Sequence, residues 1–448
     1  MTTSAPTNLL RWGIMGTGRI AHAFAKGLQH SSTGKLVAVG SRTQEAADRF
    51  ADEFAVPRRH ASYEALLADP FVDAVYISLP NHLHLEWTVR AAAAGKHILC
   101  EKPITTNHAE AMIAFEAARH HGVFLMEAFM YRCHPQTARL AELVRQGTIG
   151  DLRVIEAHFS FNVGEPKYDQ FRHQSATAGG SIMDIGCYCT TMARLMAGAA
   201  LGKEVAEPVE VKGAAAIDPV GRVDEWACAV LKFPGNIVAN LTCGMRVRDD
   251  CTVTLWGAKG HIHVPSPWFA GERTELLVYQ DGNAEPERVT VEAGAPLYTI
   301  EADTVARCVA EGRQQAPSPC MTWADSLANM RTLDRWRKDA GLTFDNEKAE
   351  ALTVPYTIRP TPRRPRPLMR YGRVPGIPRP ISRLVLGTMV LRQGDLPFAC
   401  ALLDHYVELG GNCFDTAYVY NTEGVLGRWM QLRGNRQEPT PPTATHRT

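Results

Sequence analysis

The sequence predicts an α/β protein in three parts: a domain with a parallel sheet, an α+β domain with a large, mainly antiparallel open sheet, and a C-terminal partial (β/α) barrel fragment. Three observations lead to this prediction. Short apolar runs alternate with amphipathic helical stretches over residues 9–131, which is typical of a parallel sheet covered on both faces. Longer segments that alternate polar and apolar residues follow from about residue 151, and a further strand–helix unit begins near Ile381.

The first domain, residues 1–131, is expected to contain buried strands joined by helices. Each candidate strand is a nearly continuous apolar run, as expected where helices cover both faces of the sheet. The candidate strands are residues 10–15, 35–41, 73–80, 97–103 and 122–128, and three of the intervening helices are residues 19–29, 43–54 and 85–95.

The second domain, residues 132–350, differs because its strand-like segments are amphipathic. Alternation of polar and apolar residues predicts antiparallel strands with one face in solvent, separated by turn signals such as Pro-Gly-Asn. The candidate strands are residues 153–163, 225–233, 236–245 and 251–258, and the helices 302–313 and 323–341 close the domain.

Residues 351–380 are rich in Pro and Arg and are expected to form an extended linker, because proline fixes φ and removes amide donors. The Arg cluster is short and lacks interleaved aromatic residues, so a solvated linker is favoured over a nucleic-acid patch. Residues 381–436 hold about two strand–helix units, too few to close a barrel. The tail, residues 437–448, is poor in apolar residues and is expected to be disordered.

Composition narrows the class of protein. The chain has 448 residues, a formal net charge of +1 and 45% hydrophobic residues, which argues against nucleic-acid or anionic-membrane partners. No apolar run approaches the roughly 20 residues of a membrane span, and the N-terminus lacks the features of a signal peptide. Eleven cysteines without Cys-x-x-Cys spacing indicate reduced thiols and predict a cytoplasmic location with no metal site.

A glycine-rich turn links the first strand to the first helix in Gly16-Thr17-Gly18-Arg19-Ile20-Ala21. Gly16 permits a tight turn, Gly18 lets a pyrophosphate approach the backbone at the positive end of the helix, and Ala21 allows close packing. The pattern is weak alone, but its position between strand and helix is the context that supports it. We therefore expect a dinucleotide site in a Rossmann domain, formed partly by Gly16 to Ile20.

The second strand ends in Ser41-Arg42 rather than in the Asp or Glu that NAD sites usually place there. A serine hydroxyl and a guanidinium can together bind the 2′-phosphate of NADP. Arg42 can equally stack on the adenine or remain a solvated surface residue. The sequence favours NADP as the cofactor and leaves NAD possible.

Two further motifs follow the strands at the edge where open α/β sheets bind ligands. In Leu79-Pro80-Asn81-His82-Leu83-His84, Asn81 is expected to cap the next helix and, with Leu79, Pro80 and His84, to contact the cofactor. The two histidines are poorly spaced for a metal. Glu101-Lys102-Pro103 follows the next strand; Glu101 is expected at the cofactor. A nearby cationic nicotinamide would lower the pKa of Lys102 and suit it to assist proton transfer.

Asp184 and Tyr188 are four residues apart in a helix opened by Gly179-Gly180. On one face of a helix, a carboxylate and a phenol can reach the same hydroxyl-bearing carbon. On spacing alone, however, an Asp near a helix start and a Tyr packed in the core remain the simpler interpretation.

Taken together these motifs resemble the glucose–fructose oxidoreductase, inositol dehydrogenase and rhizopine catabolism (Gfo/Idh/MocA) family over about residues 9–345. The resemblance rests on the order GIMGTGRIA, PNHLH, EKP, EAFMYRCHP and GGSIMDIGCY. It implies hydride transfer between NAD(P) and a hydroxyl carbon of a sugar or cyclitol, a homodimer or higher homo-oligomer, Lys102 as the catalytic lysine and Asp184 at the substrate. A tyrosine at position 188 resembles the branch of the family that contains dimeric dihydrodiol dehydrogenase and NADP-linked xylose dehydrogenase. In that branch the tyrosine is the acid/base.

Residues 410–420 resemble an early motif of the aldo-keto reductases, and Asp415 and Tyr420 match two of that family's four catalytic residues. The Lys and His of the tetrad belong to later strands than this fragment contains. We therefore expect a truncated, catalytically incomplete unit that is poorly ordered or sticky unless it packs on the main body.

The working hypothesis is an NADP-dependent dehydrogenase of a sugar, cyclitol or cyclic diol, in which Tyr188 and Lys102 handle the hydroxyl proton and Asp184 orients the substrate. Two alternatives stay open. One is a glycosidase that uses tightly held NAD for a transient oxidation with no net redox change. The other is a non-catalytic dinucleotide-binding protein.

Overall fold

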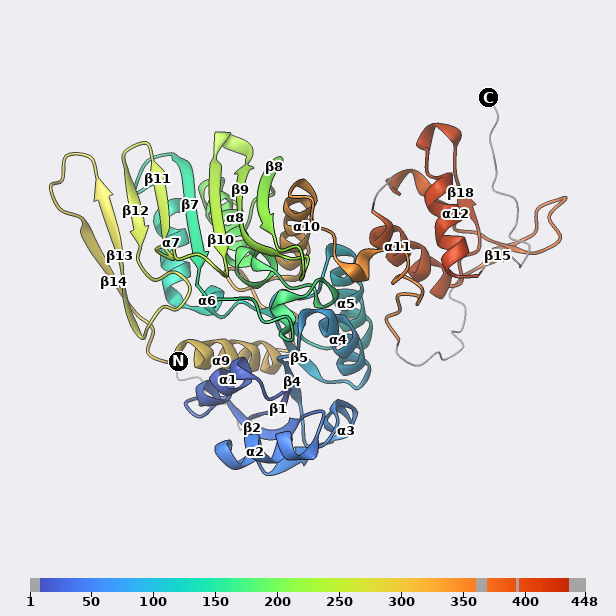
Figure 1. The fold of residues 1–448 in the computed structure, drawn as a ribbon, viewed down its shortest axis with the longest axis horizontal. Coiled ribbons are helices and arrows are strands. Elements are labelled where there is room, and N and C mark those ends of the chain that lie inside the picture. Colours follow the sequence, from blue (N-terminus) through green and yellow to red (C-terminus); the bar gives the residue numbers. More distant parts are fainter. Residues whose placement is uncertain (1–8, 360–368, 392–394, 435–448) are drawn as a thin grey trace.

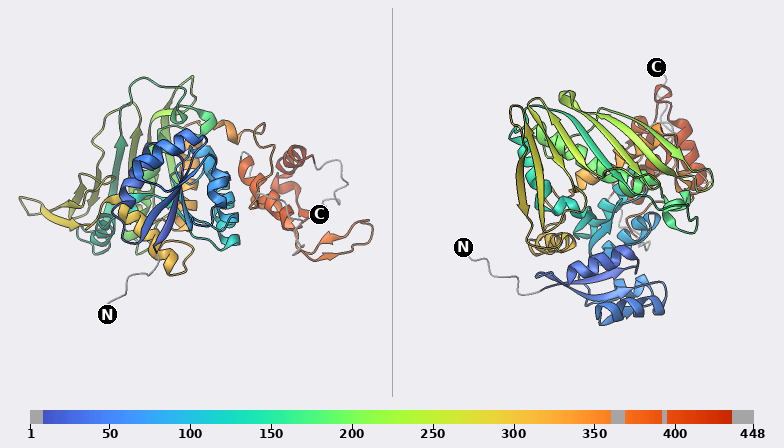
Figure 2. Two further views of the ribbon diagram at one scale, coloured as in Figure 1. Left: turned by 90° about the horizontal axis from the view of Figure 1, so that it is seen from below. Right: turned by 60° about the vertical axis from the view of Figure 1, so that its left-hand side comes forward.

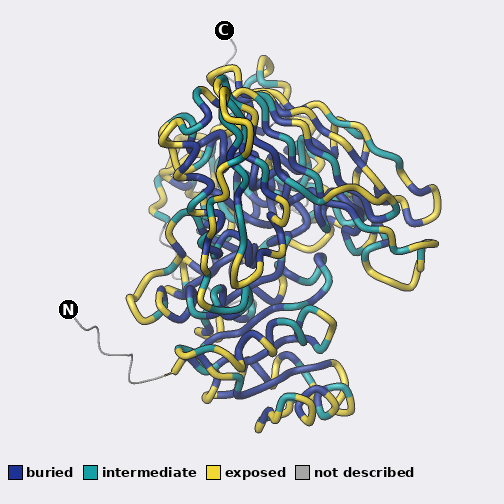
Figure 3. Tube along the Cα trace, turned by 90° about the vertical axis from the view of Figure 1, so that its left-hand side faces the viewer, coloured by how far each residue is buried: buried dark blue, intermediate teal, exposed yellow. Residues whose placement is uncertain are grey.

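The computed structural model describes residues 9–359, 369–391 and 395–434. In Figure 1 the N-terminal domain lies below a broad sheet, and a small C-terminal unit lies to one side. Buried segments run continuously through the first two domains, whereas the loops at their edges are exposed (Figure 3). Among the described residues, no helix is both long and apolar enough to cross a membrane.

The N-terminal domain is the predicted Rossmann domain, with a six-stranded parallel sheet in the order β3-β2-β1-β4-β5-β6. The order doubles back between β1 and β4, which is the switch point where such sheets bind ligands. Its strands are β1 (Leu10–Met15), β2 (Gly34–Gly40), β3 (Arg58–His60), β4 (Ala74–Ile77), β5 (His97–Glu101) and β6 (Leu125–Ala128). Its helices are α1 (Arg19–Leu28), α2 (Gln44–Phe54), α3 (Tyr63–Ala68), α4 (His84–Ala93) and α5 (His108–His121).

Polar side chains fix where several of these helices begin. Thr43 caps α2, Ser62 caps α3 and Asn107 caps α5, each by accepting a hydrogen bond from a backbone amide three residues on. β3, α3 and α5 were not predicted from the sequence. The strand is three residues long, and α5 carries buried residues around much of its circumference, so its apolar stripe is weak.

The second domain contains an eight-stranded sheet in the order β14-β13-β12-β11-β7-β10-β9-β8. Neighbouring strands are antiparallel except for β7 and β10, so the predicted large, mainly antiparallel sheet is confirmed. The strands are β7 (Leu152–Ser160), β8 (Glu210–Ile217), β9 (Asp224–Lys232), β10 (Val238–Gly244), β11 (Val253–Gly257), β12 (Gly260–Val264), β13 (Arg273–Gln280) and β14 (Glu287–Glu292).

Helices pack on one face of this sheet (Figure 2). They are α7 (Pro135–Arg145), α8 (Cys187–Ala200) and α10 (Trp323–Asp339), whereas the short α6 (Met130–Cys133) packs against α9 (Leu297–Ala310). On β9, buried Ala227, Ala229 and Leu231 alternate with exposed Trp226 and Val230, which is the expected pattern for one covered and one solvated face.

Helix α9 (Leu297–Ala310) follows the large sheet but packs back against α1 of the first domain. The Thr299 hydroxyl donates to the Gly27 carbonyl at 2.8 Å, and Asp303 accepts hydrogen bonds from the hydroxyls of Ser31 and Thr33. The two domains are therefore joined by this brace as well as by the chain between β6 and α7.

The C-terminal unit comprises α11 (Leu396–Glu408), α12 (Glu423–Leu432) and four two-residue strands. The strands are β15 (Tyr371–Gly372), β16 (Ile381–Ser382), β17 (Leu386–Gly387) and β18 (Phe414–Asp415), and β17 and β18 pair in parallel. Helix α11 packs against α5 (Figure 1). Leu352 and Tyr356, from the segment expected to be an extended linker, pack with the small core of this unit. The predicted tail lies outside the described residues.

Candidate functional site

The glycine-rich turn lies directly after β1 and leads into α1, as predicted. Gly16 adopts φ +99°, and a Cβ there would approach Leu79 and Ser78 to 3.1 Å. A Cβ on Gly18 would meet nothing within 4 Å, and α1 begins at exposed Arg19 without a side-chain cap. Thr17 and Ile20 flank this open surface. An uncapped helix start beside open glycine backbone fits a pyrophosphate.

Ser41 and Arg42 follow β2 at the same edge of the sheet. Ser41 is buried and its amide donates to the His60 carbonyl at 3.0 Å. Arg42 is exposed, and its guanidinium has no hydrogen-bond or ion-pair partner among the described residues. A free guanidinium beyond the second strand fits the 2′-phosphate of NADP.

Asn81 does not cap the following helix, so that part of the prediction is wrong. Its side-chain amide instead donates to the Ala178 carbonyl at 2.8 Å, which ties the first domain to the segment before α8. His84 is buried between the Pro103 carbonyl, 2.7 Å from Nδ1, and the Leu79 carbonyl, 2.8 Å from Nε2. Burial lowers the pKa of His84 to about 4. Together with the half-buried Pro80, these contacts join two loops at the sheet edge.

Glu101 faces inward at the end of β5. The Tyr76 hydroxyl donates to its Oε1 atom, and the Lys102 amide donates to its Oε2 atom at 3.2 Å. Burial raises the pKa of this carboxyl. These contacts hold the backbone that presents Lys102, while the expected contact of Glu101 with the cofactor stays a prediction.

Lys102 and Asp184 form the centre of the candidate site. Lys102 Nζ donates to Asp184 Oδ1 at 2.9 Å and to the Asp184 carbonyl at 2.6 Å, and each side chain is about one-sixth exposed. Asp184 lies in a single π-helical turn, Ile182–Gly186, that precedes α8. Such turns are frequent at functional sites. An ammonium has three N–H donors, so one remains for a substrate oxygen.

The protonation state of this pair follows from its surroundings. Burial lowers the pKa of Lys102, but Asp184 and the neighbouring Cys187 and Glu101 outweigh it, and the net shift is upward. Burial raises the pKa of Asp184, but Lys102, Arg172 and Arg19 bring it below its ordinary value. The chain's own residues thus keep the pair charged, opposite to the lowered lysine pKa expected from a cationic nicotinamide.

Tyr188, one turn beyond Asp184, lies in an aromatic cluster. The cluster consists of rings centred 5.0–5.8 Å from the Tyr188 ring, those of Phe129, Phe159, Tyr131 and Trp268. The Tyr188 hydroxyl contacts Met130 Sδ at 3.5 Å, and Lys102 Nζ lies 5.4 Å from the ring centroid. Burial raises the pKa of Tyr188 well above its ordinary value. The phenol is therefore held neutral, as a proton donor.

Sequence reasoning missed Arg172 and the aromatic cluster. Arg172 Nε lies 3.6 Å from Asp184 Oδ2, on the side of the carboxylate opposite Lys102. No motif marks this arginine, which lies in an irregular segment. Phe129 and Tyr131 lie within the quoted EAFMYRCHP motif, but Trp268 comes from a loop whose position pattern reading does not give.

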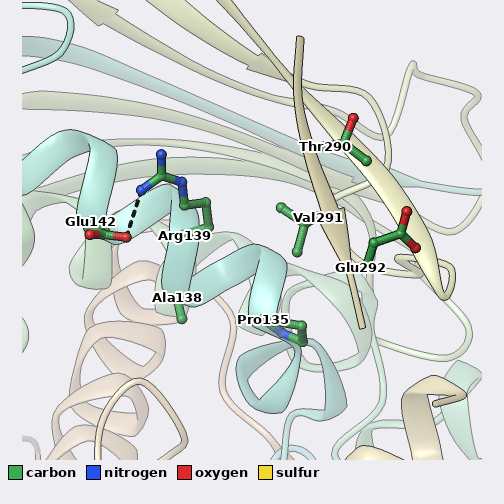
Figure 4. A pocket seen from close by; sticks show the side chains of 7 residues that line it. All are labelled: Pro135, Ala138, Arg139, Glu142, Thr290, Val291 and Glu292. Atoms are coloured by element: carbon green, nitrogen blue, oxygen red, sulfur yellow. Dashed lines mark hydrogen bonds and ion pairs between the residues drawn. The ribbon is translucent and has the colours of Figure 1, made fainter. Parts of the chain in front are cut away.

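Two surface hollows lie apart from the predicted site residues. One, of about 400 Å³, is formed by α7 and β14, with Arg139 and Glu142 paired on its helical side (Figure 4). The other, of about 220 Å³, is lined by residues that include Tyr168, His173 and Arg222. Among the described residues, no group of three or more His, Cys, Asp or Glu side chains could hold a metal ion.

Comparison with protein families gives three matches. The oxidoreductase family with an NAD-binding Rossmann fold, GFO/IDH/MocA, matches residues 10–129, and the GFO/IDH/MocA C-terminal domain matches residues 137–263. The aldo/keto reductase family matches residues 383–440. Each match coincides with one of the three parts of the fold.

Individual relatives match this chain over nearly their whole length. The trans-1,2-dihydrobenzene-1,2-diol dehydrogenase of Mus musculus is 34% identical over 348 residues, which are 76% of this chain and 99% of the relative. The NADP(+) D-xylose 1-dehydrogenase 2 of Haloferax volcanii is 34% identical over 72% of this chain and 95% of its own. The structure of the 3-ketoreductase KijD10 from Actinomadura kijaniata, in complex with NADP and TDP-benzene, is 28% identical with a TM-score of 0.66, and covers 74% of this chain and 98% of its own.

Proposed function

The chain belongs to the GFO/IDH/MocA family of NAD(P)-dependent oxidoreductases, and from this premise we propose that it is an NADP-dependent oxidoreductase. Its substrate is a sugar, a cyclitol or a cyclic diol, interconverted between hydroxyl and carbonyl forms. The observation that carries the proposal is the buried contact between Lys102 and Asp184 at the ligand-binding edge of the Rossmann sheet.

Features of the site and of the relatives favour NADP over NAD as the cofactor. Gly16 forms the tight turn, Gly18 leaves room for the pyrophosphate, and Ser41 with the unpaired Arg42 suits a 2′-phosphate. Among the relatives, the Haloferax xylose dehydrogenase and the Actinomadura ketoreductase are named with NADP. When bound, NADP supplies or accepts the hydride at the substrate carbon.

The residues of the chain would handle the proton and hold the substrate. Lys102 donates its third N–H to the reacting oxygen, and Asp184 fixes the lysine in place. Tyr188, held neutral by burial, gives its proton to the oxygen as a carbonyl is reduced. In the reverse reaction the same groups must first lose a proton, so oxidation is favoured by alkaline conditions.

A substrate panel tests the proposal. The whole chain is assayed with NADP and NAD in parallel against D-xylose, D-glucose, myo-inositol and trans-benzene dihydrodiol, with the nicotinamide absorbance as the readout. We expect at least one substrate to be oxidised with NADP, faster at pH about 9 than at pH about 7. A folded protein that binds NADPH but changes the absorbance with no member of the panel would refute the proposal.

A further inference from the structure

Arg172 lies beside the Lys102–Asp184 pair with its hydrogen-bonding capacity unused. Its Nε atom is 3.6 Å from Asp184 Oδ2, beyond hydrogen-bond range, and Nε is buried without a partner. Among the described residues none forms a hydrogen bond with the guanidinium. An arginine carries five N–H donors in a planar fork, and the four on the terminal nitrogens of Arg172 form no hydrogen bond among the described residues.

Two aromatic rings hold the guanidinium in place. Its central carbon lies 5.4 Å from the centroid of the Phe171 ring and 6.0 Å from that of Phe161. Such contacts attract a cation while leaving its N–H edge free. The Arg172 side chain is about one-fifth exposed, so a ligand can reach it without displacing the rings.

The backbone around Arg172 is fixed to both domains. The Gly180 amide donates to the Arg172 carbonyl at 2.9 Å, and a Cβ on Gly179 would lie only 2.4 Å from that same oxygen. Two residues before Gly180, the Ala178 carbonyl accepts the hydrogen bond from Asn81 of the Rossmann domain. Arg172 is therefore preorganised beside the catalytic pair rather than carried on an unattached loop.

Positive charge exceeds negative charge here. Lys102 lies 2.9 Å from one oxygen of Asp184 and Arg172 lies 3.6 Å from the other, so two cations share one carboxylate. Glu101, which precedes Lys102 in the chain, is buried and accepts a hydrogen bond from the Tyr76 hydroxyl, and burial raises its pKa. A neutral sugar would leave the surplus charge uncompensated, whereas an anionic group would pair with it.

We propose, resting on the function proposed above, that Arg172 binds an anionic oxygen group of the substrate. The site then takes a sugar that carries a carboxylate or a phosphate in preference to the neutral sugar. A carboxylate and a phosphate both match the two parallel N–H bonds of a guanidinium. Lys102 and Asp184 act on the reacting carbon, and Arg172 fixes the charged end of the same molecule.

Steady-state kinetics with NADP test this on matched sugars: D-glucose, D-glucuronate and D-glucose 6-phosphate. For the unaltered chain we expect a lower KM for at least one anionic sugar than for glucose. Arg172→Gln should raise that KM about tenfold or more, and the KM of glucose by less than about threefold. Arg172→Lys keeps the positive charge but loses the planar pair of N–H donors, so its KM for the anionic sugar should lie between those of the unaltered chain and Arg172→Gln. Arg90→Gln, which removes an arginine stacked on Trp87 away from the site, should change neither.

An equal rise in KM for all three sugars in Arg172→Gln would show that Arg172 only positions Asp184, and would overturn the inference. It would also be overturned if the unaltered chain had no lower KM for either anionic sugar than for glucose. Titration of the NADPH complex with each sugar, followed by nicotinamide fluorescence, separates this result from failure of the proposed function. Arg172-dependent binding of an anionic sugar without turnover would support the anion site and count against the dehydrogenase. Turnover of neutral sugars alone would support the dehydrogenase and count against the anion site.

Discussion

Lys102 and Asp184 are 82 residues apart in the chain and meet in a largely buried contact. A buried ion pair contributes little net stability, but removing one partner leaves an uncompensated charge. Here the remaining charge would not be isolated, because Arg172 also faces Asp184. The arrangement therefore allows the role of the lysine in chemistry to be tested apart from its role in folding.

Lys102→Met should lower turnover far more than it weakens NADP binding, because the lysine contacts the substrate oxygen in the proposed mechanism. We expect kcat to fall by about 10²- to 10⁴-fold, the usual range for a lost acid–base group. Lys96→Met is the matched control, since Lys96 is also a buried lysine but donates only to the carbonyls of Asp69 and Val72. Equal turnover in the Lys102 variant and the unaltered chain would refute the assignment.

Arg42→Ala should weaken NADP binding without weakening NAD binding, because only NADP carries the phosphate that the free guanidinium would pair with. Loss of a charge-assisted hydrogen bond predicts a rise of about tenfold or more in the KM for NADP. Arg59→Ala is a useful control, since Arg59 lies on β3 nearby but pairs with Asp48 and Asp52 of α2. A parallel loss of affinity for both cofactors would instead place Arg42 against the shared adenine.

Glu110 gives the protein a pH-dependent stability. Burial raises its pKa from 4.5 to about 7, although the Thr106 amide and hydroxyl donate to it. Between those pKa values the folded state holds a proton that the unfolded state has lost, so stability falls as pH rises through this window. Glu110→Gln should be up to about 3 kcal/mol more stable than the unaltered chain at pH 8, and little different at pH 4.

Urea denaturation at both pH values measures this difference. Glu116→Gln, on the same helix, is the control of opposite sign. Arg119 lowers the pKa of Glu116, so its contribution is present above the unfolded pKa and lost as pH falls. A stability difference for Glu110→Gln that does not vary with pH would show that the pKa of Glu110 is the same in the folded and unfolded chain, against this prediction.

At the residue scale, sequence patterns singled out most of the candidate site residues but not the contacts between them. The positions of the glycine motif and of Ser41-Arg42 could be predicted, because each directly follows a strand with a clear apolar pattern. The contact of Lys102 with Asp184 depends on how two domains meet, which spacing does not encode. The same holds for the Tyr188 hydroxyl, which faces Met130, and for Arg172, whose carbonyl lies against the backbone of Gly179 and Gly180 in an irregular segment.

At the scale of elements, the turn before α8 is the most constrained part of the site. Gly180 adopts φ +100°, and a Cβ there would lie 2.1 Å from Asp224 Oδ1. Asp224 in turn accepts hydrogen bonds from the Ser181 hydroxyl at 2.6 Å and the Ile182 amide at 2.7 Å. The glycine and the aspartate together fix how the π-helical turn is anchored to the first residue of β9.

Gly180→Ala should therefore destabilise the fold by about 2 kcal/mol or more and reduce activity, through both backbone strain and the clash with Asp224. Gly202→Ala isolates the first effect, because Gly202 has φ +68° with nothing within 4 Å of a Cβ. We expect only about 1 kcal/mol for the control. Thermal unfolding measures the stability of both variants. Equal losses of stability would show that Asp224 moves aside for the new methyl group at no energetic cost.

Elements with a strong period were the ones that the sequence predicted. β1, β2 and β5 are continuous apolar runs, and β9 alternates cleanly, so each could be placed. The outer strands β13 and β14 are more exposed and carry a weaker pattern. A helix opened by Gly179-Gly180 and running to Met196 was expected, but its first turn is π-helical because contacts to β9, rather than local propensity, set its start.

At the scale of the whole molecule, the C-terminal unit is attached away from the candidate site. Its helix α11 packs on α5, and Leu352 and Tyr356 complete its core. Asp415 and Tyr420, which match the aldo-keto reductase tetrad, lie in this unit, while Lys102 and Asp184 lie where the two larger domains meet. The fragment was expected to be poorly ordered or sticky unless it packs on the main body, and α11 makes such a contact with α5.

A chain that ends after Arg359 should keep the kcat and KM of the full protein within about twofold, because it retains every residue of the candidate site. Its melting temperature should fall by a few degrees, since Leu352 and the α11-facing side of α5 become exposed. Thermal unfolding and NADP-linked kinetics on both chains test this. A shortened chain that folds but loses activity would give the C-terminal unit a part in catalysis.

The π-helical turn at Ile182–Gly186 has a consequence for how the site can change over generations. A π turn is an α-helix with one extra residue, and each residue of an α-helix turns by about 100°. Loss of a single codon there would restore a regular helix and leave α8 in register. It would also rotate Asp184 away from Lys102, so an in-frame deletion of three nucleotides could silence the enzyme while preserving its fold.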